Sequence, residues 1–392
     1  MALPNVIIAL GNGNMGRSAA TADGVAGLLL TGSAVSEKLE LGKHYQLSST
    51  RDLTTLGITA ENNPLADKEV KAFYAQAGDG AELHLMVVAA ATTLTQMCAA
   101  EADSPLTSLI NAAGGRIRLI GVNKIAPAEY EATLTQGIDG DAVTAAAAAQ
   151  QCLESLAAQI KPARLLMPAP AWNGETEELF QPASASYNRV GMVLASDDAV
   201  IRTAAIGQIL GRAAKNDPQI SIARVKDGSI ATEGYFTNGK SYLEMAGLAD
   251  ALHDAGYIFY RSFPTKNGCY LNDDCMAAPI TDDYRYLSDG RIIDKAYTIA
   301  YSTYIEEIQD KVAVDEKGRL PEGLCRSFQS MLENAVAAQM TGQISDFEAY
   351  IDPEQNILST GVMEVAATIT PLGTLRQIKV NMAFTNPAIA NN

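Results

Sequence analysis

Histidine is scarce in this chain of 392 residues, which contains only His44, His84 and His253. The three lie far apart in sequence, and none has the spacing that places two imidazole ligands on one helical face. We therefore expect no histidine-based metal site. The five cysteines include no Cys-x-x-Cys pair, which is typical of reduced thiols in the cytoplasm rather than of a disulfide framework.

The sequence also lacks long apolar runs and an excess of basic residues. No segment approaches the roughly 20 apolar residues of a membrane-spanning helix, and the N-terminus lacks the features of a signal peptide. We expect no membrane insertion. The 29 lysines and arginines are outnumbered by 45 aspartates and glutamates, which gives a formal net charge of -16. Binding to nucleic acid is not expected, because its phosphates would be repelled.

Motifs of known catalytic sites are missing as well. The sequence contains no Gly-x-Ser-x-Gly motif, no Walker loop and no calcium-binding loop. It does contain three pairs of adjacent aspartates, at 197–198, 273–274 and 282–283. Such pairs in turns are usually solvated, so we expect no catalytic residue among them.

One segment does suggest a cofactor. Residues 11–16, Gly-Asn-Gly-Asn-Met-Gly, follow an apolar run and match the Gly-x-Gly-x-x-Gly motif of dinucleotide sites. Such a site needs a helix directly after the third glycine, and Gly24 and Gly27 inside it would cost about 1 kcal/mol each relative to alanine. The next strand candidate, residues 25–31, ends without the acidic residue that binds the ribose. We therefore favour a flexible glycine-rich arm without a cofactor, and keep a nicotinamide- or flavin-dependent oxidoreductase as an alternative.

The remaining sequence predicts a multi-domain α/β protein, because segments with helical and alternating periodicity follow one another between turn signals. Helices are expected at residues 65–77, 142–160, 199–215, 243–255, 292–311 and 321–340. Strands are expected at residues 83–88, 116–122, 164–167, 190–195, 220–225, 257–263, 362–370 and 376–384. Their order predicts a small doubly wound layer, followed after about residue 240 by a second domain.

The last two predicted strands are antiparallel in character. Residues 371–373, Pro-Leu-Gly, would turn the chain between them. The second strand has Ile378, Val380, Met382 and Phe384 on one face. Little chain follows to cover its edge, and an uncovered edge invites a partner strand.

Several segments in order resemble the sheath proteins of contractile tails. Residues 23–32, with a Val-Ala-Gly motif, are similar to the strand that follows an N-terminal arm in that family, and residues 45–57 and 70–88 to the elements that come next. The similarity continues in the C-terminal third, at residues 256–261, 284–288, 291–297, 356–365, 371 and 378–382. The resemblance is nearest to Mu-like phage and prophage tails, which are related to tailocins and contractile injection systems. The usual arginine-rich start of the C-terminal helix is reduced here to Arg291 near Lys295.

The resemblance implies a structural subunit, not an enzyme. Many copies would polymerise helically around a tail tube, and contraction would drive the tube through a target envelope. The implied partners are other copies, the tail tube protein, and baseplate and tail terminator proteins. The implied location is the host bacterial cytoplasm during assembly and then the sheath of a virion tail or injection particle.

The resemblance also implies a division of the chain. It gives an N-terminal arm (1–22), an outer α/β domain (23–242), a C-terminal sheath domain with mixed sheet and helices (243–374) and a C-terminal strand and arm (375–392). Both arms would add strands to neighbouring subunits. The N-terminal strand would comprise Val6, Ile7, Ile8, Ala9 and Leu10, with hinges at Gly11, Gly13 and Gly16, and the C-terminal strand Ile378, Val380, Met382 and Phe384.

A third alternative is a structural or adaptor protein that does not contract. It would have the same acidic α/β composition. Polymerisation distinguishes it from a sheath subunit.

Overall fold

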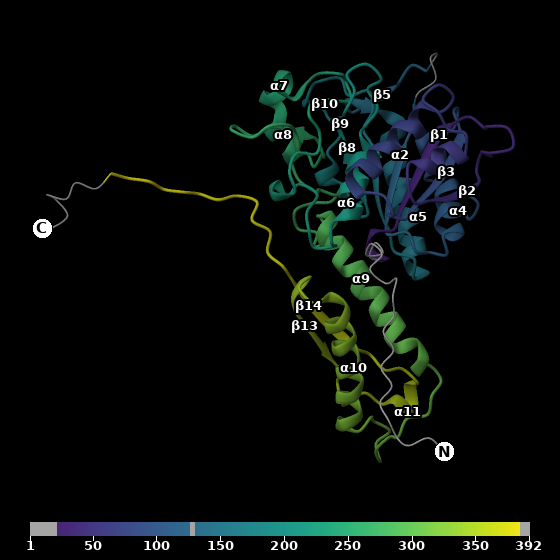
Figure 1. The fold of residues 1–392 in the computed structure, drawn as a ribbon. Coiled ribbons are helices and arrows are strands. Elements are labelled where there is room, and N and C mark those ends of the chain that lie inside the picture. The colour runs from purple at the N-terminus through teal and green to yellow at the C-terminus, as the bar shows by residue number, and fades with distance from the viewer. Residues whose placement is uncertain (1–21, 126–129, 385–392) are drawn as a thin grey trace, which may run out of the picture.

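Two packed units and an extended C-terminal segment make up the part of the chain that the computed structural model describes, residues 22–125 and 130–384. Helix α9 (Leu287–Tyr304) runs from the first unit into the second (Figure 1). Among the described helices, none combines the length and the hydrophobicity that crossing a membrane requires.

The first unit is built on a six-stranded sheet in the order β2-β3-β1-β4-β7-β8. Its strands are β1 (Ala26–Gly32), β2 (His44–Leu47), β3 (Leu83–Ala89), β4 (Leu119–Asn123), β7 (Arg164–Pro168) and β8 (Val190–Val193). All neighbours are parallel except β2, which pairs antiparallel with β3. The parallel strands are almost continuously apolar because helices cover both faces of the sheet.

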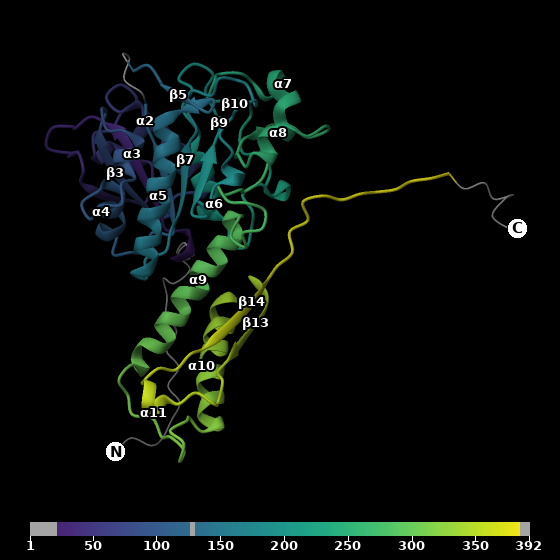
Figure 2. The same ribbon diagram turned by 180° about the vertical axis from the view of Figure 1, so that it is seen from behind.

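The two faces of the sheet carry separate helical layers. Helices α2 (Pro64–Ala77) and α6 (Ile206–Lys215) pack with Leu28 and Leu30 of β1, while α4 (Pro105–Ala112) and α5 (Gly140–Ala158) pack with Leu29. Figure 2, which views the molecule from behind, shows α5 in front of the sheet. The first unit is therefore a doubly wound α/β layer, as the sequence predicts.

Helices α2 and α6 approach each other closely at two glycines. A Cβ atom at Gly207 or Gly211 would collide with the backbone oxygen of Glu69 or Phe73. The small residues, one helical turn apart, thus set the distance between these helices.

Short elements complete the first unit. They are α1 (Arg51–Thr55), α3 (Leu94–Met97), α7 (Tyr242–Met245), α8 (Ala249–Asp254), and the strand pairs β5 (Leu134–Thr135) with β6 (Ile138–Asp139), β9 (Ala195–Ser196) with β10 (Tyr235–Phe236), and β11 (Tyr260–Arg261) with β12 (Tyr270–Leu271). Leu252, Tyr257 and Phe259 belong to the same core cluster as Leu29. Residues from 249 to about 275 therefore pack with the first unit.

The second unit contains the distal part of α9, α10 (Glu322–Met340), α11 (Ile357–Thr360) and a hairpin-like pair of antiparallel strands, β13 (Ile344–Tyr350) and β14 (Ala366–Pro371). Its small core joins Ile299 of α9, Val336 of α10 and Ala349 of β13. This core is separate from those of the first unit.

Most predicted elements are confirmed. The helix predicted at 199–215 begins only at Ile206, the strand predicted at 257–263 is reduced to Tyr260–Arg261, and three further predictions are wrong. Residues 220–225 form turns instead of a strand, and residues 243–255 form short helical pieces instead of one helix. Residues 376–384 form no strand, because β14 pairs with β13 and the chain continues past Pro371 without reversing. Alternating residues favour an extended backbone, but they do not choose its partner strand.

A buried ion pair joins the sheet to α9. Arg164 of β7 donates from Nε to Oδ2 of Asp294 (2.7 Å) and from Nη2 to Oδ1 (3.1 Å), and its side chain is 1% exposed. Arg189 donates to the same carboxylate at 3.1 Å. The absence of a side chain at Gly290 gives the Arg164 guanidinium its space beside the helix.

We predict that Asp294→Ala lowers the free energy of unfolding by about 3–5 kcal/mol, because it leaves buried guanidinium groups without their carboxylate. Urea denaturation followed by circular dichroism measures this change. The matched control is Arg326→Ala, which breaks an exposed pair with Glu322 and is expected to change stability by less than about 1 kcal/mol. Equal effects of the two substitutions would contradict the structural role of Asp294.

Candidate functional site

The C-terminal arm, residues 372–384, is the most exposed part of the described chain. The four residues predicted for its pairing strand, Ile378, Val380, Met382 and Phe384, are at least 70% exposed. Apolar side chains in such a row are rarely left in water, and they mark an interaction surface. The predicted N-terminal strand (Val6, Ile7, Ile8, Ala9, Leu10) and hinge (Gly11, Gly13, Gly16) lie outside the described residues.

The β13–β14 pair offers complementary edges. Within the described residues these two strands pair only with each other, so each has one edge with unpaired backbone groups. One face of the pair packs on α9 and α10 through Phe347 and Ile369. An additional strand could therefore extend this sheet on either side through main-chain hydrogen bonds.

The aspartate pair at 273–274 differs from the sequence prediction, because it is buried rather than solvated. Asp273 is 6% exposed and Asp274 is fully buried. Asp274 accepts hydrogen bonds from the backbone N–H and the hydroxyl of Ser288 in the first turn of α9. Burial and the neighbouring Asp273 raise the pKa of Asp274 to about 6. The sequence alone does not predict this burial, because the pairs at 197–198 and 282–283 show the same adjacent aspartates.

The structure also brings together three side chains that can bind metals. Ligand atoms of His253, Asp273 and Cys275 lie within 4.8 Å of one another, although the histidine is 20 positions from the aspartate. Two observations argue against a bound cation. The Asp273 carboxylate already pairs with Arg376, and burial raises the pKa of the Cys275 thiol to about 12, so its thiolate is disfavoured.

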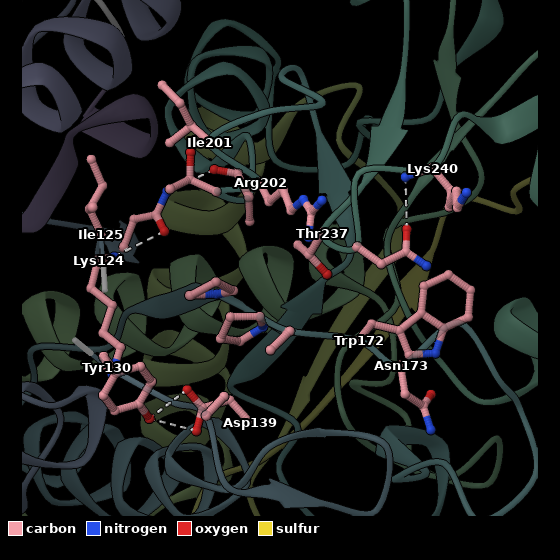
Figure 3. Close-up of a pocket in the computed structure, with 18 residues that line it drawn as sticks. Lys124, Ile125, Tyr130, Asp139, Trp172, Asn173, Ile201, Arg202, Thr237 and Lys240 are labelled. Carbon is pink, nitrogen blue, oxygen red and sulfur yellow. Dashed lines mark hydrogen bonds between the residues drawn. The ribbon is translucent and has the colours of Figure 1, made fainter. Parts of the chain in front are cut away.

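A cavity of about 620 Å³ opens beyond the carboxyl ends of β4 and β7 (Figure 3). It lies at the edge of the sheet formed by the carboxyl ends of the strands, where doubly wound proteins bind their ligands, but between β4 and β7 and not at the point between β1 and β4 where the strand order reverses. Tyr130 and Asp139 line one side, and Trp172 and Asn173 line the other. Asp139 accepts a hydrogen bond from the Tyr130 hydroxyl (2.8 Å) and caps the N-terminus of α5. This carboxylate is thus occupied by structural contacts.

The remaining charged lining residues are cations. Lys124 pairs with Asp141 at 2.8 Å, while Arg202 and Lys240 come from two separate loops. None of the described lining residues is a serine, cysteine or histidine. The cavity can attract an anion, but it presents no nucleophile paired with a base.

The loop after β1 does not have the form of a dinucleotide site. Asn63 accepts a hydrogen bond from the Ser33 N–H (2.8 Å) and donates to the Ser33 carbonyl (3.0 Å), and it is buried there. None of the described strands of the sheet is followed by a Gly-x-Gly-x-x-Gly motif, which the fingerprint requires after its first strand. The described sheet therefore gives the oxidoreductase alternative no support.

We predict no saturable binding of NADH or FAD. Trp172, the only tryptophan of the chain, lines the cavity, so its fluorescence reports on ligands that enter. Titration with either cofactor is expected to lower the Trp172 fluorescence only because the cofactor absorbs light. Free tryptophan, the control, should lose fluorescence to the same extent. A saturable quench that Arg202→Gln abolishes would restore the oxidoreductase alternative.

Comparison with known proteins assigns both parts of the chain. The DUF2586 N-terminal domain matches residues 3–275, and the DUF2586 C-terminal domain matches residues 283–389. No curated protein sequence matches the chain. The two matches meet close to the start of α9.

Solved structures share the fold over its whole length. A chain of the anti-feeding prophage helical sheath in its contracted state is 15% identical, with a TM-score of 0.62, and the match covers 98% of this chain and 99% of that one. The PVC sheath complex of an extracellular contractile injection system gives 12% identity and a TM-score of 0.56, with 98% of each chain covered. The sheath tail protein of Desulfitobacterium hafniense gives 10% identity and 0.51, with 94% and 100% covered.

These matches confirm, at the level of the fold, the resemblance to sheath proteins. They include both units and the helix between them. Because the two domain matches together span most of the sequence in the expected order, the chain belongs to the DUF2586 family.

Proposed function

We propose that this protein is the structural subunit of a contractile sheath. The observation that carries the proposal is the match of almost the whole chain to almost the whole of chains from two contractile sheath assemblies. A fold shared in part would fit many α/β proteins, since a doubly wound layer alone hosts unrelated functions. Here the second unit and its arrangement after α9 are shared as well.

The exposed arm and the open β13–β14 edges support polymerisation by strand addition. In the proposed assembly, Ile378, Val380, Met382 and Phe384 place their apolar face on a neighbouring subunit, while the backbone pairs with an open edge. Residues 6–10 would add a second strand from the N-terminal arm, and Gly11, Gly13 and Gly16 would let that arm change direction. The arm boundaries at residues 22 and 374 belong to the same proposal, whereas the packing of residues 249–275 with the first unit favours a boundary between the two units near the start of α9 instead of residue 242.

Work in such a machine comes from assembly. Subunits polymerise around a tail tube in a lattice of higher free energy, and they slide into a better-buried lattice on contraction. The proposed partners are therefore other copies, the tube, the baseplate and the tail terminator. No catalytic residue or cofactor is needed, and the particle would assemble in the host cytoplasm before it acts as a virion tail or injection particle.

We predict that deleting residues 2–16 leaves a folded, soluble protein that forms no tubes. The deletion removes the proposed N-terminal strand and hinge but no residue of the described cores. Negative-stain electron microscopy of concentrated protein measures assembly, and circular dichroism measures folding. Normal tubes from the truncated protein would contradict the role of the N-terminal arm.

The C-terminal arm allows a matched pair of variants. Val380→Asp with Met382→Asp places two charges on the proposed contact face and is expected to prevent tube formation. Gln377→Asp with Asn381→Asp adds the same charge on the other face and is expected to assemble normally. If both double variants assemble, the arm is not a donor strand. If the unaltered chain never polymerises with its tube partner present, the non-contractile adaptor is favoured instead.

A further inference from the structure

One residue ties the exposed C-terminal arm to the first unit. Arg376 donates from Nε to Oδ2 of Asp273 (3.1 Å) and from Nη2 to Oδ1 of Asp274 (3.4 Å). Its guanidinium carbon also lies 3.3 Å from the centroid of the Tyr286 ring. Within the described arm, only Arg376 forms ion pairs with another part of the protein. Leu375 and Ile378, on either side of Arg376 in the sequence, are exposed.

The surroundings explain why an arginine fits here. Two adjacent buried carboxylates repel each other, and a cation between them relieves that repulsion. Ser288 satisfies Oδ2 of Asp274, which leaves Oδ1 to Arg376. A planar guanidinium can reach both carboxylates and stack on the Tyr286 ring at once, whereas a lysine ammonium cannot match this geometry.

We propose that Asp273, Asp274 and Tyr286 form an arginine-binding socket whose occupancy by Arg376 sets how far the C-terminal arm reaches toward a second copy of this chain. The inference rests on the proposed function, in which the arm donates a strand to that copy. It assigns a role to a residue outside the donor strand itself.

The reach follows from the chain length on each side of Arg376. With the socket occupied, residues 377–384 are free, and eight extended residues span at most about 26 Å. With the socket empty, the free segment begins after β14 ends at Pro371, which adds five residues and at most about 17 Å. A neighbour could then move away by a comparable distance while the paired strand stays in place.

The exposure of the contact suits a reversible anchor. The Arg376 side chain is 33% exposed, whereas that of Arg164 in the pair that joins the sheet to α9 is 1% exposed. On release the Arg376 guanidinium can be hydrated without opening a core, while Asp274 keeps its hydrogen bonds from Ser288. The buried pair of Arg164 with Asp294 thus holds α9 on the sheet, whereas the more exposed pair of Arg376 with Asp273 is suited to release.

Spin-label distances in the monomer test the socket directly. All five native cysteines are buried, so labels can be directed to the exposed variants Gln377→Cys and Thr281→Cys. We expect a narrow distance distribution in this doubly labelled protein, and its loss with Arg376→Ala or Arg376→Lys. Lys379→Ala, which removes a neighbouring positive charge of the arm, is the matched control and should keep the narrow distribution. An unchanged distribution in Arg376→Ala would overturn the socket.

Assembly tests the effect on reach separately. Arg376→Ala keeps the donor strand, so it is expected to form tubes that contract at a lower denaturant concentration than tubes without the substitution. Equal thresholds would overturn the role in reach even if the label distances change. Failure of the unsubstituted chain to form tubes would refute the proposed function, while the distances in the monomer would still decide whether the socket exists.

Discussion

The buried contact between Arg164 and Asp294 is the constraint on which the arrangement of the molecule depends. It ties β7, inside the sheet, to the helix that carries the second unit, and Arg189 donates to the same carboxylate. Because the pair is almost fully removed from water, both partners must be present for either to be tolerated. The first unit therefore provides a fixed base for α9, and everything beyond α9 is positioned from that base.

Local sequence patterns predicted the elements whose neighbours are close in the chain or buried on all sides. The helix at residues 65–77 and the strand at 83–88 are confirmed because helical periodicity ends at Gly78 and a compact apolar run follows Gly80. The segment at 220–225 has an alternating pattern but lies in turns, where its residues pack against α6 without a strand partner. Pairing of β14 with β13 depends on packing against α9 and α10, which no local window contains.

The candidate site was predictable to the extent that it lies in the arm itself. Alternating apolar residues at 378–384 indicate a strand without a partner, and the structure shows these side chains in water. The aspartates at 273 and 274 could not be recognised, because their burial comes from α9 and their cation comes from a residue about 100 positions later. The glycine motif at 11–16 argues against a dinucleotide site because the sequence after it predicts neither the required helix nor the acidic residue that binds the ribose.

The burial of all five thiols has a chemical consequence for the proposed assembly. Oxidants outside the cytoplasm attack accessible thiolates, and here burial raises the pKa of Cys98, Cys152, Cys269, Cys275 and Cys325. Copies stacked at high density would otherwise offer many opportunities for disulfide exchange between neighbours. In the proposed sheath, the burial of these thiols would therefore disfavour covalent cross-links that prevent subunits from sliding.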